Sequence, residues 1–126
     1  DDIDKKGITA YTFIKDMDMA YSIADIIISR AGAIAIAELC CVGKPTILVP
    51  SPNVAENHQY KNAQSLVNKN AALLVEDASA NRKLVDTLEE LLSNENLKMS
   101  LASNIKQIAV RDAANRIVKA ALDLVK

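Results

Sequence analysis

Short apolar runs alternate along this chain with longer stretches of helical periodicity, and this alternation restricts the fold more than any other feature. The run "DIIIS" at Asp25–Ser29 is followed by an Ala/Ile/Leu stretch from Ala33 to Val42. That stretch ends at Gly43, just before the run "TILVP" at Thr46–Pro50. Continuous apolar runs of this length are typical of strands buried on both faces of a parallel sheet. The β, α, β, α order therefore predicts an α/β domain with a parallel sheet and flanking helices.

The same pattern extends in both directions along the chain. On the amino-terminal side it predicts a strand at Ile8–Ile14 and a helix at Asp16–Ala24, which the carboxylate of Asp16 caps. On the carboxyl-terminal side it predicts a helix at Glu56–Asn70 and a fourth strand at Ala71–Glu76.

The remainder of the chain has helical periodicity throughout. Its apolar residues fall on three successive faces, so we expect three amphipathic helices, with a turn at Ser93 and Asn94 between the first two. A chain of 126 residues, half of them apolar, can build one hydrophobic core. With neither a linker nor an internal repeat in the sequence, we expect residues 1–126 to form a single domain.

Composition and charge argue against several classes of protein. The net charge of −1 gives no reason to expect a nucleic-acid partner. Cys40 and Cys41 are neighbours without metal-ligand spacing, which argues against a disulfide framework and a zinc site and favours a reducing, cytoplasmic compartment. No apolar run reaches the roughly 20 residues of a transmembrane helix, and nothing at the start of the sequence resembles a signal peptide.

Ligands of open parallel sheets bind where the strands end and the loops lead into helices. The loop "SRAG" at Ser29–Gly32 precedes a predicted helix, whose amino-terminal N–H groups and dipole favour an anion such as phosphate. Gly32 permits close approach of the backbone to such a ligand, although a glycine that eases a tight turn explains the residue equally well. Neither a GxGxxG fingerprint nor a P-loop lysine is present.

Glu38 is the one charged residue of that predicted helix. It lies one turn from Ile34 and one from Val42, among residues expected to pack against the sheet, where a carboxylate needs a partner. One interpretation is an exposed position or an ion pair with Arg30 or Lys44. The other is an acceptor for the two hydroxyls of a ribose whose phosphates lie at the start of the helix.

Another such loop, between Ser51 and Asn57, leads into "HQYKNA". His58, Gln59 and Asn62 at the start of that helix carry groups able to reach sugar hydroxyls, but a solvated or capping histidine is an equal alternative for His58. The "DMD" at residues 16–18 has the form of a metal-binding DxD, but an acidic helix start explains it more simply.

Five blocks occur in a distinctive order: "FIKDM", "AYSIADIIISRAGA", a Glu five residues later, "GKPTILVPSP" and "NHQYKNA". This order resembles the carboxyl-terminal half of the peptidoglycan N-acetylglucosaminyltransferases, inverting enzymes that convert lipid I into lipid II. The resemblance is strong from about Thr12 to Ala72 and weaker through the terminal helices. It implies a Rossmann-like donor-binding domain of a GT-B type glycosyltransferase, with UDP-N-acetylglucosamine as its ligand.

The resemblance also implies roles for individual residues. The Ile14 backbone would meet uracil with Met17 close by, Glu38 would hold the ribose hydroxyls, and His58 and Gln59 would face the N-acetylglucosamine. The residues near the diphosphate would be Gly32, Ala33, Ile34, Ala35, Ile36 and Ala37. Relatives often carry Thr or Ser at the position of Ala35, so phosphate contacts in this chain would come from backbone N–H groups.

The resemblance implies that much of the enzyme lies outside this chain, including the earliest strands of the donor-binding domain, so residues 1–126 are expected to be a single partial domain. In the family, the acceptor domain carries the candidate catalytic base, the lipid I site and the membrane-facing patch. We therefore expect no catalytic residue, metal or cofactor here, and no activity of the chain alone. The full-length protein is expected to be peripheral on the cytoplasmic face of the membrane, because its acceptor domain contacts the membrane.

Two other classes share these motifs. One is a small donor-binding subunit that acts with a membrane partner on a lipid-linked sugar, and an exposed apolar face would be its mark. The other is a non-enzymatic module with a degenerate nucleotide site, which nucleotide-sugar affinity would exclude. A nucleotide-sugar 2-epimerase fits the motif spacing less well.

Overall fold

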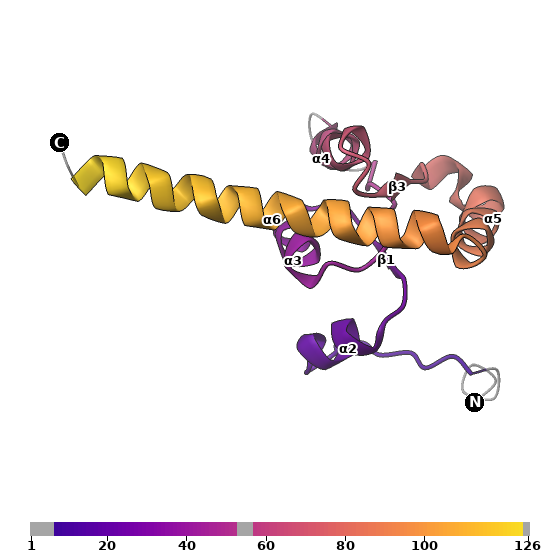
Figure 1. Cartoon of the computed structure of the whole chain (residues 1–126). Helices are drawn as coiled ribbons and strands as arrows, with labels where there is room; N and C mark the ends of the chain where they lie inside the picture. The colour runs from indigo at the N-terminus through magenta and orange to yellow at the C-terminus, as the bar shows by residue number, and fades with distance from the viewer. Residues whose placement is uncertain (1–6, 53–56, 125–126) are drawn as a thin grey trace.

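The structure, a computed structural model, describes residues 7–52 and 57–124. Helices surround a small sheet, and the last helix crosses the domain and projects beyond it (Figure 1). The elements in chain order are α2 (Met17–Ile23), β1 (Ile27–Ser29), α3 (Ala33–Val42), β2 (Thr46–Leu48), α4 (His58–Asn68), β3 (Leu73–Leu74), the 3-10 helix η2 (Asp77–Ser79), α5 (Ala80–Leu92) and α6 (Glu95–Leu124).

The sheet has three parallel strands in the order β1-β2-β3. Ile28 of β1 lies opposite Ile47 of β2, and Leu48 lies opposite Leu74 of β3. The predicted α/β fold with a parallel sheet and flanking helices is therefore confirmed. All three residues of the central strand β2 are buried. β1 is an edge strand, and Ile28 is 42% exposed, so the prediction that Asp25–Ser29 is buried on both faces was wrong.

The core consists of two clusters that meet at β2, because successive strand residues point to opposite faces. Leu48 packs with Leu39 of α3 and Ile105 of α6, and Ile47 packs with Leu91 of α5 and with a further α6 residue, Leu101. α6 contributes to both clusters, so this helix is a structural support of the whole domain.

Residues Ile8–Ile14 do not form the predicted strand. The side chains of Tyr11 and Phe13 are 67% and 78% exposed. β-branched and aromatic residues stabilise a strand only by packing and pairing with neighbours. The segment pairs with none of the described strands, so its composition alone does not make it a strand.

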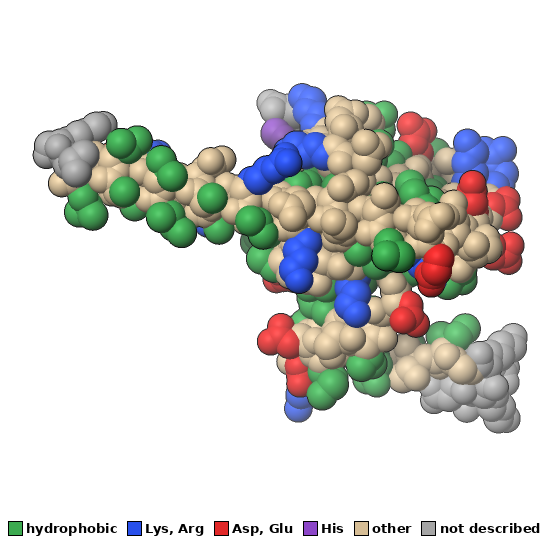
Figure 2. All heavy atoms as spheres, viewed as in Figure 1, with side chains coloured by type: hydrophobic (Ala, Val, Ile, Leu, Met, Phe, Trp, Pro, Cys, Tyr) green, Lys and Arg blue, Asp and Glu red, His purple; other side chains and the backbone are tan. Residues whose placement is uncertain are grey.

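The last two of the three predicted terminal helices are one helix, α6, whereas the turn at residues 93–94 after α5 is confirmed. No Gly or Pro interrupts residues 95–124, so nothing in the backbone ends the helix between the two predicted faces. Every described residue from Val110 onward is exposed. Hydrophobic side chains form separate patches along this projecting end (Figure 2).

No helix among residues 7–52 and 57–124 is both long and apolar enough to cross a membrane.

Candidate functional site

A hollow of about 530 Å³ separates α2 from α3. α2 begins where the Asp16 carboxylate accepts a hydrogen bond of 2.9 Å from the Met19 N–H, which confirms that Asp16 caps this helix. α3 ends at Gly43, whose positive φ of 70° favours glycine. The residues that line the hollow are Met17, Asp18, Tyr21, Ala37, Glu38, Cys41 and Val42.

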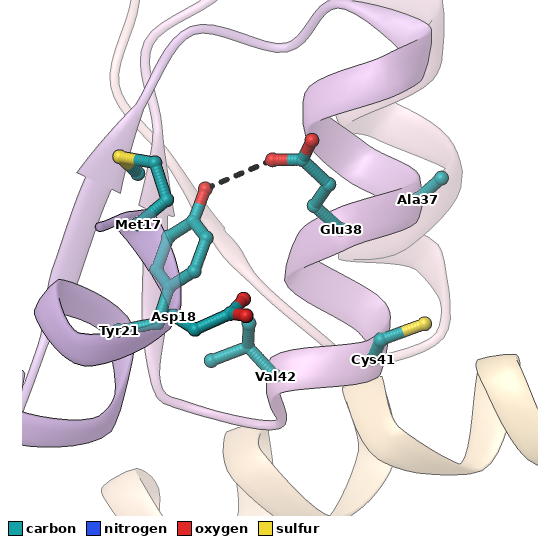
Figure 3. Close-up of a pocket in the computed structure, with 7 residues that line it drawn as sticks. All are labelled: Met17, Asp18, Tyr21, Ala37, Glu38, Cys41 and Val42. Carbon is teal, nitrogen blue, oxygen red and sulfur yellow. Dashed lines mark hydrogen bonds between the residues drawn. The ribbon is translucent and has the colours of Figure 1, made fainter. Parts of the chain in front are cut away.

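Tyr21 and Glu38 meet across this hollow. The Tyr21 hydroxyl donates a hydrogen bond of 3.2 Å to Glu38 Oε2, and the two side chains reach toward one another from α2 and α3 (Figure 3). Partial burial raises the pKa of Tyr21, and the hydrogen bond to Glu38 and the negative charge of that carboxylate raise it further. Tyr21 therefore stays protonated and orients one oxygen of Glu38.

Glu38 is exposed, so the expectation that it packs against the sheet was wrong. The buried residues of α3 are Leu39 and Cys40, whereas Ile34 on the Glu38 face is 79% exposed. All residues of α3 apart from Glu38 are apolar, so the sequence pattern did not show which face of the helix turns inward.

The cations proposed as partners of Glu38 have other contacts. Arg30 Nη1 lies 2.6 Å from Asp77 Oδ1 and also donates to the Val49 carbonyl. Lys44 Nζ donates to the Ser22 carbonyl at 3.3 Å. The exposed position, not the ion pair, is therefore the structural setting of Glu38.

The amino terminus of α3 opens on the loop after β1. Gly32 is the N-cap, and its carbonyl accepts the N–H of Ile36 at 2.9 Å. The N–H groups that precede Ile36 in the first turn of α3 have no acceptor within the helix, so they are available as donors on the side of the loop. Gly32 has φ −67° and ψ 153°, which any residue adopts, so a tight turn does not account for this glycine.

The start of α4 contacts the same loop. Gln59 Oε1 accepts hydrogen bonds from the N–H groups of Ala31 (3.2 Å) and Ser51 (2.8 Å). Asn62 Nδ2 donates to the Ala31 carbonyl at 3.1 Å. His58, the first residue of α4, is exposed. The loop before α4 includes residues 53–56, which lie outside the described residues.

Five of the predicted site residues form two groups. Met17, Ala37 and Glu38 lie together around the hollow between α2 and α3. Gly32 and Gln59 lie together where α3 and α4 begin, since a Cβ added at Gly32 would be 3.8 Å from Gln59 Nε2. The side chain of Ile14 lines a different hollow, formed by α2 and the segment before it, so the structure does not bring it to Glu38.

The sequence interpretation missed Tyr21, Cys41 and Val42, and it considered Asp18 only as part of a metal-binding DxD. Tyr21 and Asp18 fall within or beside the motifs that carry the family resemblance, but no spacing rule points from Tyr21 to a carboxylate 17 residues away. Helical spacing does place Cys41 and Val42 one turn beyond Glu38, and this was the available signal.

A family model, curated proteins and a solved structure all relate this chain to the same group of glycosyltransferases. Residues 2–117 match the family described as "Glycosyltransferase family 28 C-terminal domain". A protein of Phocaeicola vulgatus named UDP-N-acetylglucosamine--N-acetylmuramyl-(pentapeptide) pyrophosphoryl-undecaprenol N-acetylglucosamine transferase is 55% identical over 107 residues, which are 85% of this chain and 28% of that protein. A Cytophaga hutchinsonii protein of the same name is 50% identical over 113 residues, 90% of this chain and 31% of that protein.

Among solved structures, the crystal structure of Acinetobacter baumannii MurG superposes with a TM-score of 0.73 at 33% identity, covering 90% of this chain and 32% of that one. The chain thus spans less than a third of the length of these relatives. The match of residues 2–117 shows that the chain belongs to the glycosyltransferase family 28 C-terminal domain family.

Proposed function

We propose that this chain is the donor-binding domain of a glycosyltransferase that transfers N-acetylglucosamine from UDP-N-acetylglucosamine to lipid I, which gives lipid II. The names of the relatives support this proposal, since they describe an N-acetylglucosamine transfer to an undecaprenol-linked muramyl pentapeptide. The observation that carries it is the hollow between α2 and α3, where Glu38 presents a carboxylate beside the helix whose amino terminus opens on the β1–α3 loop.

A nucleoside diphosphate fits this arrangement chemically. Glu38 has one oxygen bonded to Tyr21, and its other oxygen is available to accept from ribose hydroxyls. The donor N–H groups at the start of α3 suit a diphosphate, because a helix amino terminus carries partial positive charge. Met17 lines the same hollow and would lie near the uracil.

The remaining assignments follow the resemblance. The Ile14 backbone would bind uracil, and residues 32–37 would lie near the diphosphate. His58 and Gln59 at the start of α4 would face the sugar, on the side of Gly32 where Gln59 Nε2 lies. In the transfer, the α3 amino terminus would stabilise the charge of the departing UDP, a role that needs no divalent metal.

The acceptor side of the reaction belongs to the rest of the longer protein in this proposal. Lipid I, the catalytic base and the membrane contact would be provided there, at the cytoplasmic face of the membrane. Residues 1–126 then form part of a single donor-binding domain and carry no catalytic residue.

Calorimetric titration of UDP-N-acetylglucosamine into the chain tests the proposal. We expect saturable binding that weakens by about 1 to 3 kcal/mol in Glu38→Ala, because a charged hydrogen-bonding partner is lost. Glu89→Ala, at an exposed position of α5, is the matched control and should bind like the wild type. UDP-glucose is the ligand control for sugar recognition.

Two outcomes would contradict the proposal. Folded wild-type chain that binds no UDP-N-acetylglucosamine would contradict donor binding by this chain and favour a degenerate module. If wild type and Glu38→Ala bind UDP-N-acetylglucosamine with equal affinity, Glu38 does not hold the ribose hydroxyls, even if binding is tight.

A further inference from the structure

The peptide groups of Ala31 are held by side chains of α4. Its N–H donates to Gln59 Oε1, and its carbonyl accepts from Asn62 Nδ2. Ala31 itself is 0% exposed. Both polar groups of a buried backbone residue, just past the end of β1, are therefore satisfied by two side chains three positions apart on one helix.

Gln59 connects this residue to a second loop. Its Oε1 accepts from Ser51 as well as from Ala31, and Ser51 follows β2 as Ala31 follows β1. Two N–H donors converge on this oxygen, so the opposite orientation of the amide would place NH₂ against both donors. The orientation of Gln59 is thus fixed, and its Nε2 lies on the Gly32 side.

The Ala31 peptide lies directly before the start of α3. Gly32, the next residue, is the N-cap, and Ala33 is the first helical residue. Backbone dihedrals set at Ala31 consequently determine where the first N–H groups of α3 point. No side chain caps α3 at Gly32. The side-chain hydrogen bonds that the structure gives next to this helix start are those of Gln59 and Asn62 with Ala31.

We propose that Gln59 and Asn62 are positioning residues, which fix the Ala31 peptide and thereby direct the amino terminus of α3 at the donor diphosphate. This inference rests on the proposed function and deepens it. Oε1 of Gln59 accepts hydrogen bonds from the loops after β1 and β2. Any contact of the Gln59 side chain with the sugar therefore comes from Nε2, which acts as a hydrogen-bond donor. Asn62 acts through Ala31, and its amide nitrogen does not serve the sugar.

Comparing two ligands separates positioning from direct contact. UDP and UDP-N-acetylglucosamine share the diphosphate, and only the second carries the sugar. We expect Asn62→Ala to weaken both ligands by the same factor, roughly tenfold, because the N–H donors at the start of α3 are no longer directed at the diphosphate. Gln59→Met should weaken UDP by a similar factor and UDP-N-acetylglucosamine by at least as much, because a sugar contact of Nε2 is lost as well. The matched controls on α4 are Asn68→Ala and Gln64→Met, which remove a bond that does not reach the loop.

Amide hydrogen exchange provides a readout that needs no ligand. Gln59→Met should exchange faster at the N–H groups of Ala31 and Ser51, whereas Gln64→Met should leave both unchanged. Circular dichroism and the melting temperature check the fold of each variant. If Gln59→Met does not fold, Asn62→Ala, which removes a single hydrogen bond, carries the ligand comparison.

Each other outcome overturns the proposal in a different way. Loss of UDP-N-acetylglucosamine affinity with unchanged UDP affinity would make the two residues direct sugar contacts. Unchanged affinity for both ligands, or unchanged amide exchange in Gln59→Met, would show that the bonds do not position the loop. If the wild-type chain binds neither ligand, the proposed function fails for this chain, and the role at the diphosphate fails with it.

Discussion

At the residue scale, the hydroxyl of Tyr21 determines how the carboxylate of Glu38 is presented. Tyr21→Phe keeps the ring and removes only this hydrogen bond, so Glu38 should lose its fixed orientation and keep its charge. We expect UDP-N-acetylglucosamine affinity to fall about two- to tenfold, less than in Glu38→Ala. Calorimetry checks this, with Tyr11→Phe, at a 67% exposed position, as the control. Unchanged affinity in Tyr21→Phe would show that Glu38 needs no orienting partner.

The same pair predicts a pH dependence of stability. The pKa of Tyr21 in the folded chain is raised above the ordinary value of 10.0, because partial burial and the Glu38 carboxylate disfavour the phenolate. Above pH 10.0 the folded state therefore binds more protons than the unfolded state, and the free energy of unfolding falls as pH rises. Below that pH the contribution is complete. Denaturant unfolding across this range should show a steeper fall for wild type than for Tyr21→Phe, and equal slopes would contradict the assignment.

The sequence identified Glu38 because a lone carboxylate in an apolar helix is unusual, but it did not identify the exposed face or the partner. Both depend on how α2 lies against α3, which local periodicity does not encode. The hydrogen bonds of Gln59 and Asn62 with Ala31 likewise depend on how two elements, here α4 and the loop before α3, lie against each other. The sequence indicated that these side chains could reach a ligand, and tertiary packing places them on a backbone peptide about 30 residues away.

At the scale of elements, the helix boundaries at α3 followed from the sequence because Gly43 marks a local conformational requirement. The irregular structure of Ile8–Ile14 and the continuity of α6 did not follow. Strand formation depends on a neighbouring strand, and two apolar faces along a segment without helix breakers do not reveal whether one helix or two will form. Local signals therefore located elements well and decided poorly between one long element and two short ones.

α6 allows a direct test of which of its halves supports the domain. Ile105 is 0% exposed and packs with α3 and β2, whereas Ile117, three turns later, is 69% exposed. Ile105→Ala should lower the free energy of unfolding by about 2 to 5 kcal/mol, because it leaves a cavity in the core. Ile117→Ala is the matched control and should lie within about 0.5 kcal/mol of wild type. Chemical denaturation measures both, and similar losses would show that the projecting half of α6 is packed in solution.

At the scale of the whole molecule, the chain spans less than a third of its relatives, and transfer of the sugar requires an acceptor site that we assign to the rest of the longer protein. We expect the chain alone to bind UDP-N-acetylglucosamine and to transfer nothing to lipid I. Exposed apolar side chains, among them Ile117, Leu122 and Leu124, lie along the projecting end of α6. An exposed apolar surface is also the mark of a small donor-binding subunit that acts with a partner, so this feature fits either class.

A chimera tests this division of labour. Replacing the matching region of the Phocaeicola vulgatus relative, 55% identical over 107 residues, with this chain should give a protein that converts lipid I into lipid II. Because Glu38 is proposed to bind the donor and not to react, Glu38→Ala in the chimera should raise the KM for UDP-N-acetylglucosamine more than it lowers kcat. Glu89→Ala in the same chimera should change neither constant.

A folded chimera that binds the donor without transferring it would show that this domain contributes less to the reaction than its relatives' domains do. A fall in kcat alone would instead place Glu38 in the chemical step.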